Sequence, residues 1–233
     1  MRCDPIPTIR READAFLAAA RRGLEAQVPG CPEWTVRELT HHVGVDYLWH
    51  ARHIVRGETS EPEEWQPELP PDDELLEWFD ECCNELLITL RSTDPELPAW
   101  NWAPRTAQKV AWWLPRLAIE TAVHRWDAES AHRDAHGIDL DVALDGIDEM
   151  VTVIGPAHTK PDFPTGTIVI RPTDDETIWA VRLAPETFEL IEHAPSSPDA
   201  VIEGTTTALL LAFWGRDADY TMTGDPALAA VLT

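Results

Sequence analysis

Residues 35–57 read TVRELTHHVGVDYLWHARHIVRG and carry the clearest helix signal in the chain. Thr35 and Glu38 have the spacing of a capping box, in which each residue satisfies a backbone N–H at the helix start. Apolar residues recur every three or four positions as far as Ile54, and Gly57 is typical of a helix end. The pattern predicts a helix with one buried face.

The same periodicity extends over the first two-thirds of the chain. It predicts further helices at about 8–27, 72–91, 106–135 and 140–154. The stretch 58–71 is dense in Glu and Pro and is predicted to be a loop. Long helices joined by ordinary loops favour an up-and-down bundle.

After Pro156 the pattern changes to short β-rich runs bounded by Pro, Gly and Asp. Strands are expected near 167–171, 178–183, 188–193, 200–203 and 219–223, with helices at 206–214 and from 226. The sequence therefore predicts two domains, a helical bundle over 1–156 and a small α+β domain over 157–233.

Composition excludes several classes of protein. The 233 residues carry a formal net charge of −24, and both predicted domains are acidic. Such a surface repels nucleic-acid phosphates and anionic lipid. The first residues show no signal-peptide core and no apolar run approaches the ~20 residues of a membrane span, so we expect a cytoplasmic protein. The four cysteines have no C-x-x-C spacing and are interpreted as buried thiols.

Glu120 and His124 lie four residues apart in the predicted fourth helix. Residues at this spacing stack on one helix face, so a carboxylate oxygen and an imidazole nitrogen can reach one metal ion. Asp127 lies near the same face, where it could orient a ligand or bind substrate. The E-x-x-x-H spacing alone is also typical of a solvated salt link.

The helix over 35–57 contains four histidines that could complete such a site. At 100° per residue, His41 lies nearly opposite the apolar stripe, His42 lies at its edge, and His50 lies close to its centre. Periodicity excludes His41 and leaves both His42 and His50 as candidates. Two histidines and one glutamate would leave the fourth position of zinc open, as in catalytic sites. Trp100, Asn101 and Trp102 are candidates for lining a ligand cavity, although packing would also account for them.

Several segments resemble one known family. They are Cys31–Val36 (CPEWTV) with Leu39 and His42-Val43-Gly44, Leu117–Ala128 with its ETAVHRWD block, Trp214-Gly215-Arg216, and Thr223–Ala230 (TGDPALAA). Together they resemble the mycothiol-dependent maleylpyruvate isomerase-like proteins of the DinB-like superfamily, over nearly the whole chain.

The resemblance implies a DinB-like four-helix bundle followed by a small α+β domain similar to sterol carrier protein. It assigns the metal ligands to His42, Glu120 and His124, and it implies zinc or another divalent metal with mycothiol, an actinobacterial thiol, as cosubstrate. It also implies that Arg216 reaches the active site and binds an anionic substrate. The sequence departs from the family at Glu33 and at Pro115, which would kink the fourth helix or mark a later start.

The expected activity is activation of the thiol for S-transfer to a small electrophile, or for its cis–trans isomerisation. Two alternatives stay open at this point. One is a metal-dependent hydrolase, in which the open metal position holds water. The other is a non-catalytic small-molecule-binding module with a vestigial metal site.

Overall fold

The computed structural model describes residues 1–103 and 106–232, and it divides into two compact units. Among these residues, the first unit comprises 1–102 and 106–138, and the second comprises 139–232 together with Ala103. The units divide between Ile138 and Asp139, and the domain boundary predicted after Pro156 stays a prediction. No helix among the described residues is both long and apolar enough to cross a membrane.

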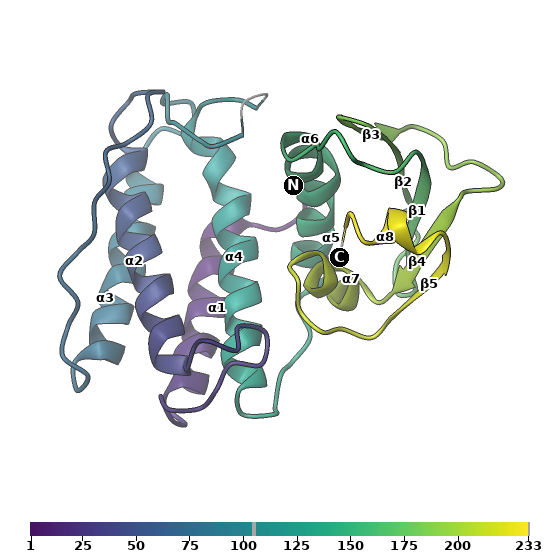
Figure 1. Ribbon diagram of the computed structural model, residues 1–233. Helices are drawn as coiled ribbons and strands as arrows, with labels where there is room; N and C mark the ends of the chain where they lie inside the picture. The colour runs from purple at the N-terminus through teal and green to yellow at the C-terminus, as the bar shows by residue number, and fades with distance from the viewer. Residues whose placement is uncertain (104–105, 233) are drawn as a thin grey trace. The chain divides into compact units, whose positions relative to one another are not determined.

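The first unit is built from four long helices, shown in Figure 1. They are α1 (Pro5–Ala20), α2 (Val36–Ile54), α3 (Leu75–Ser92) and α4 (Val110–Ser130). Helix α1 packs mainly on α4, and α2 packs mainly on α3. Their shared core includes Phe16 stacked on Phe79 at 4.7 Å between ring centroids, with Tyr47 against Phe79 at 5.7 Å. The predicted four-helix bundle is confirmed.

The ends of two bundle helices depend on local backbone chemistry. The capping box of Thr35 and Glu38 is present at the start of α2, as predicted. Helix α1 ends at Ala20, seven residues earlier than the periodicity indicates, and Gly23 follows with a positive φ of 153°. Helix α4 begins at Val110 and continues through Pro115, so the proline costs one backbone hydrogen bond without delaying the helix start.

The second unit begins with α5 (Leu140–Glu149), which continues through a π-helical turn (Met150–Ile154) into α6 (Gly155–Ala157). A five-stranded sheet follows in the order β3-β2-β1-β4-β5. Its strands are β1 (Gly166–Pro172), β2 (Trp179–Ala184), β3 (Thr187–Ile191), β4 (Ala200–Gly204) and β5 (Tyr220–Gly224). Strands β1 and β4 are parallel, and the other neighbouring strands are antiparallel.

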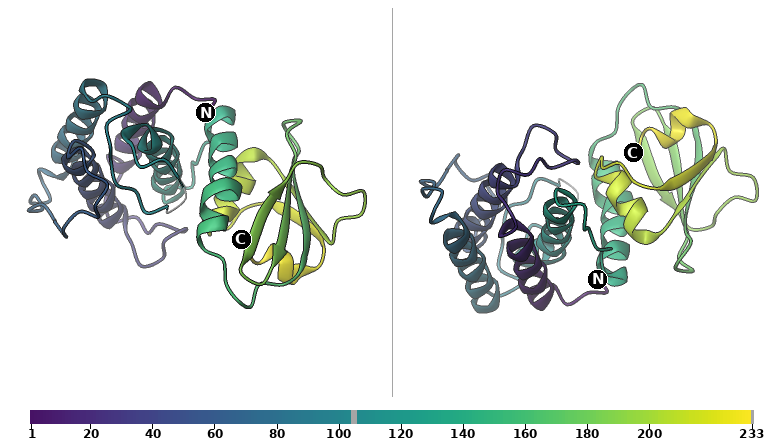
Figure 2. Two further views of the ribbon diagram at one scale, coloured as in Figure 1. Left: turned by 90° about the horizontal axis from the view of Figure 1, so that it is seen from above. Right: turned by 90° about the horizontal axis from the view of Figure 1, so that it is seen from below.

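Two further helices complete this unit, α7 (Thr206–Phe213) and α8 (Pro226–Ala229). Helix α7 packs on α5 and on β4, and Figure 2 shows α5 and α7 on the same side of the sheet. The parallel pair β1 and β4 requires a crossover connection, which the β2–β3 hairpin and the following loop provide. The predicted α+β fold of this part is confirmed.

Candidate metal centre and its cavity

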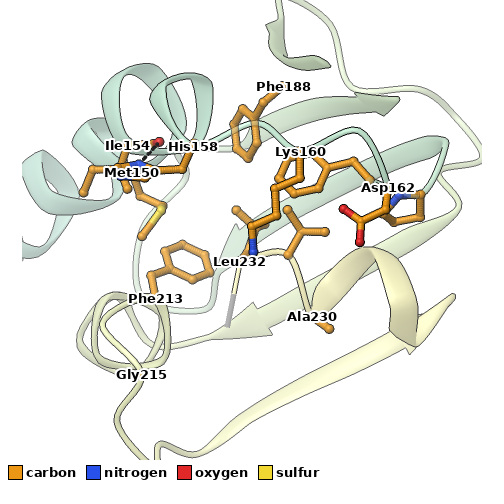
Figure 3. Close-up of a pocket in the computed structure, with 14 residues that line it drawn as sticks. Met150, Ile154, His158, Lys160, Asp162, Phe188, Phe213, Gly215, Ala230 and Leu232 are labelled. Carbon is orange, nitrogen blue, oxygen red and sulfur yellow. Dashed lines mark hydrogen bonds between the residues drawn. The ribbon is translucent and has the colours of Figure 1, made fainter. Parts of the chain in front are cut away.

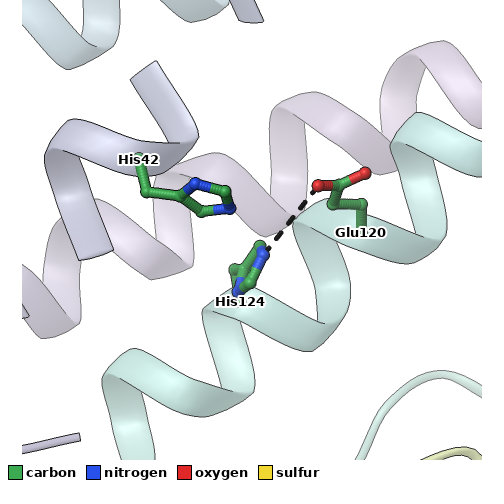
Figure 4. Close-up of side chains that lie close together, drawn as sticks. All are labelled: His42, Glu120 and His124. Atoms are coloured by element: carbon green, nitrogen blue, oxygen red, sulfur yellow. Dashed lines mark ion pairs between the residues drawn. The ribbon is translucent and has the colours of Figure 1, made fainter. Parts of the chain in front are cut away.

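Two facing helices of the bundle bring three candidate metal ligands together. Helix α2 carries His42, and α4 carries Glu120 and His124 one turn apart (Figure 4). The histidine nitrogens and carboxylate oxygen that could bind a metal all lie within 4.8 Å of one another. The two imidazole rings are 5.1 Å apart between centroids and nearly perpendicular, at 85°. Nε2 of His124 lies 4.0 Å from Oε1 of Glu120.

The donor set and spacing fit a divalent metal such as zinc. Zinc–nitrogen bonds of about 2.0 Å in a tetrahedral site place neighbouring ligand atoms ~3.3 Å apart. To bind one ion, the ligand atoms of the three side chains would have to move closer to one another by roughly 1 Å or slightly more. Small side-chain rotations allow a movement of this size. Among residues 1–103 and 106–232, this is the one group of three such side chains at ligand spacing. His50, the other histidine that periodicity leaves open, is not part of the group.

Asp127 contacts one of the three candidate ligands. Its carboxylate is fully buried, and Oδ2 lies 3.1 Å from Nδ1 of His124. An ionised carboxylate can only accept, so Nδ1 of His124 donates the hydrogen and Nε2 keeps its lone pair for a metal. Burial favours this orienting role for Asp127 over direct contact with substrate.

A cavity of about 480 Å³ opens beside the cluster. Its wall is mostly aromatic, and His42 and Glu120 form part of it. The lining residues are His42, Val45, Asp46, Trp49, His50, Trp65, Gln66, Trp100, Trp102, Trp113, Arg116 and Glu120. Trp100 and Trp102 line the cavity as the sequence suggested. The side chain of Asn101 instead donates to the carbonyl of Ala107 at 2.9 Å.

Charges of both signs meet in this cavity. Arg116 lies one helical turn before Glu120, and its Nη2 is 3.4 Å from Oε2 of that carboxylate. Burial raises the pKa of Glu120 and the nearby carboxylate of Asp46 raises it further, while Arg116 and His124 oppose the shift. Because a guanidinium stays protonated, Arg116 places a fixed positive charge close to the candidate metal ligands.

Asp46 and Arg116 are site residues that the sequence interpretation missed. A usable signal existed for both, because Asp46 follows His42 by four residues and Arg116 precedes Glu120 by four. Each therefore shares a helix face with a predicted ligand.

Arg216 lies in the second unit, directly after α7. Its guanidinium Nη1 donates to the carbonyl oxygen of Trp214 at 2.6 Å and lies 5.9 Å from the centroid of the Trp214 ring. That Arg216 reaches the active site stays a prediction. A separate cavity of about 460 Å³ in this unit is lined by Phe163, Phe188 and Phe213 among others (Figure 3).

Comparison with known proteins decides the family. The family model of the mycothiol maleylpyruvate isomerase N-terminal domain matches residues 6–129, more than half of the chain. The chain belongs to the mycothiol maleylpyruvate isomerase family. The MDMPI C-terminal domain matches residues 141–230, so both characteristic parts of the family are present in order.

Two solved structures have the same fold as this family member. One is the crystal structure of the mycothiol-dependent maleylpyruvate isomerase, with a TM-score of 0.62 and 14% sequence identity over 94% of this chain and 91% of that one. The other is a histidine-to-alanine mutant of that enzyme, with a TM-score of 0.61 and the same identity and coverage. No curated protein matches the sequence at a significant level.

Proposed function

We propose that this chain is a metal-dependent enzyme that uses mycothiol to isomerise, or to transfer sulfur to, a small electrophilic substrate, with zinc as its metal. The observation that carries the proposal is the convergence of His42, Glu120 and His124 beside an aromatic cavity. Membership of the mycothiol maleylpyruvate isomerase family supplies the thiol and the type of reaction.

The protein's own residues divide the work at such a site. His42, Glu120 and His124 would hold the metal, and Asp127 keeps the ring of His124 in the tautomer that can bind it. When bound, a divalent metal stabilises a thiolate at neutral pH. His42, Glu120 and His124 would supply three ligands to such an ion, and a bound metal would then have room for the sulfur of the cosubstrate.

The cavity supplies binding and charge. Trp49, Trp100 and Trp113 give flat apolar surface that removes a substrate from water. Arg116 offers a guanidinium that can hold a carboxylate in two places. An anionic electrophile is thereby attracted to this cavity, although the chain as a whole is strongly acidic.

Attack by the same thiolate can lead either to isomerisation or to S-transfer. Addition of the sulfur to one carbon of a cis double bond forms a C–S bond and moves the π electrons onto the activating carbonyl of the substrate. Rotation about the resulting single bond, followed by cleavage of the C–S bond, returns the thiolate and the trans product. If the adduct is protonated at carbon and released, the reaction is S-transfer.

Loss of one candidate ligand should remove both the metal and the thiol-dependent activity. Turnover of an activated cis-alkene carboxylate is expected to require both bound metal and mycothiol. His42→Ala removes one of three ligands and is expected to lower bound zinc from about one per chain to well below that level. Metal analysis on the purified protein, followed by turnover with and without mycothiol, gives the measurement.

His41→Ala is the matched control, because His41 neighbours His42 in sequence but packs against Trp78 on α3. It should keep its zinc. Loss of metal from His41→Ala with retention by His42→Ala would contradict the ligand assignment. Cleavage of an ester or amide without thiol would favour a hydrolase, and full zinc content without any thiol-dependent turnover would favour a binding module.

A further inference from the structure

His50 is a buried histidine in the wall of the same cavity. Its side chain is 5% exposed, and its ring packs on Trp113 at 4.3 Å and on Trp49 at 4.9 Å between centroids. It lies two turns after His42 on α2 and is not among the three candidate metal ligands. Packing alone would account for an apolar residue at this position but not for an imidazole.

One ring nitrogen of His50 is fully engaged by Asp46. Nδ1 lies 2.8 Å from the backbone carbonyl oxygen of Asp46 and 3.2 Å from Oδ2 of its carboxylate. A backbone carbonyl can only accept a hydrogen bond, so Nδ1 carries a hydrogen whether the ring is neutral or charged. The neutral ring must then keep its lone pair on Nε2.

Nε2 of His50 is buried and has no hydrogen-bond partner among residues 1–103 and 106–232. Buried polar atoms without partners are uncommon, because leaving one unsatisfied costs roughly 1–3 kcal/mol. The orphaned nitrogen belongs to a ring that lines the cavity beside the candidate metal ligands. This combination of an oriented ring and a vacant acceptor is typical of a general base.

We propose that His50, oriented by Asp46, accepts the proton of the thiol when the cosubstrate binds. The proposal rests on the proposed function, since it presumes a thiol in this cavity. The S–H bond breaks, its electron pair stays on sulfur, and the proton moves to Nε2 of His50. The proton returns to sulfur when the thiol leaves, so an isomerisation cycle leaves the ring unchanged.

The charges around His50 favour this transfer. On its own helix it faces Asp46, with His42 and His53 nearby, and α4 contributes Glu120 and Arg116 to the same cavity. Among the described residues, the segments at 65–66 and 100–102 contribute the uncharged side chains of Trp65, Gln66, Trp100 and Trp102 to the lining. Carboxylates on two sides stabilise an imidazolium at this position.

The pKa shifts of His50 and Asp46 also favour proton transfer to His50. Burial by itself would lower the pKa of His50, but the charge and hydrogen bond of Asp46 and the charge of Glu120 outweigh burial and raise it. Burial likewise would raise the pKa of Asp46, yet His50 holds it below its ordinary value. Asp46 is therefore a weak base that stabilises the charged ring, and His50 is the stronger base.

Proton release on thiol binding tests the proposal without turnover. Zinc-loaded protein is mixed with mycothiol at pH 8 in weak buffer containing a pH indicator, below the thiol pKa of about 8.5. The wild type is expected to release almost no proton per thiol bound, because His50 retains it. His50→Gln, which keeps a polar group of similar size, is expected to release about one proton per thiol bound, with the bound amount measured by calorimetry.

His53→Gln is the matched control. His53 lies on the same helix, and its ring nitrogens also have no partner in the part of the chain that the structure describes, but it lines a different cavity with Arg52 and Arg56. It should behave as the wild type does. If the wild type binds thiol and releases a full proton, or if His50→Gln releases no more than the wild type, the role of His50 is overturned while the proposed function stands. If zinc-loaded wild type binds no mycothiol, the proposed function itself fails, and the role of His50 fails with it.

A second variant keeps the imidazole in place should His50→Gln not fold. Asp46→Asn removes the carboxylate that stabilises the imidazolium, so the acid limb of the kcat/KM profile should move to lower pH. Zinc content is measured alongside, because Asp46 lies one turn from His42. An acid limb unchanged in Asp46→Asn at full zinc content would overturn the pairing of Asp46 with His50.

Discussion

At the scale of single residues, we expect the contact between His124 and Asp127 to set how tightly the candidate site holds a metal. Asp127→Asn keeps the size of the side chain and an acceptor oxygen but removes the charge that holds the hydrogen on Nδ1 of His124. Such partners of metal-binding histidines typically change metal affinity by about 10- to 100-fold. We expect a loss of that size, measured by competition with a chelating dye.

Asp134→Asn is the control for this variant. Asp134 pairs with Arg22 on the surface of the same unit, and exposed pairs of this kind contribute little. Its metal affinity should match the wild type. Equal affinity in the Asp127 variant would show that Asp127 has no part in orienting His124.

The choice between His42 and His50 shows what sequence can predict at this scale. Periodicity places both near the buried face of α2, and both are partly or fully buried in the structure. It cannot say which of them faces α4, because that depends on how two helices far apart in sequence are rotated against each other. The family resemblance selected His42, and the geometry brings His42 to Glu120 and His124.

At the scale of elements, a buried ion network joins α1 to the end of α4. Nε of Arg125 donates to Glu12 at 2.8 Å, and Nη1 donates to Glu129 at 2.8 Å. The same guanidinium donates to the backbone carbonyls of His136 and Gly137. Arg125 follows His124 directly, so this network also fixes the part of α4 that carries the site.

Arg125→Ala is expected to destabilise the bundle by about 3 kcal/mol, because the buried carboxylates of Glu12 and Glu129 lose the buried guanidinium between them, although Glu12 keeps the half-exposed Arg11 at 2.9 Å. Urea denaturation followed by tryptophan fluorescence measures the change. Arg22→Ala removes an exposed arginine and should change stability by no more than about 1 kcal/mol. A small effect of Arg125→Ala would mean that water replaces the guanidinium, and the network would then have no structural role.

The boundaries of the elements were predictable where a local signal exists. The capping box set the start of α2, and the β-rich runs located all five strands to within a few residues. The end of α1 and the continuation of α4 through Pro115 could not be predicted from the sequence. Packing against neighbouring helices can override weak local preferences of this kind. The π-helical turn at Met150–Ile154 likewise has no signal in apolar spacing.

At the scale of the whole molecule, Arg216 is the residue through which the second unit could take part in the reaction. With a net charge of −24, binding of an anionic substrate needs local cations. Arg116 supplies one within the bundle. The family resemblance predicts that Arg216 is a second cation for the substrate. The structure places Arg216 at the C-terminus of α7, where a cation is also favoured for stability alone.

The geometry at this helix end separates the two roles of Arg216. Gly215 has a φ of +73°, and the N–H groups of Gly215 and Arg216 donate to the carbonyls of Ala212 and Leu211, both at 2.9 Å. This is a Schellman motif, which caps α7 through the backbone whatever the side chain at position 216. Arg216→Lys keeps the charge, so its effect on stability should stay below about 1 kcal/mol.

If Arg216 instead holds a substrate carboxylate, lysine cannot reproduce the two parallel hydrogen bonds of a guanidinium. Turnover by Arg216→Lys should then fall more than tenfold, about 1.4 kcal/mol in the activation barrier, at unchanged zinc content and melting temperature. Steady-state kinetics with one anionic and one neutral electrophile supplies the measurement, and the loss should be confined to the anionic one. Normal turnover of the anionic electrophile by Arg216→Lys would show that Arg216 holds no substrate carboxylate, and its positive charge at the C-terminus of α7 would then serve stability only.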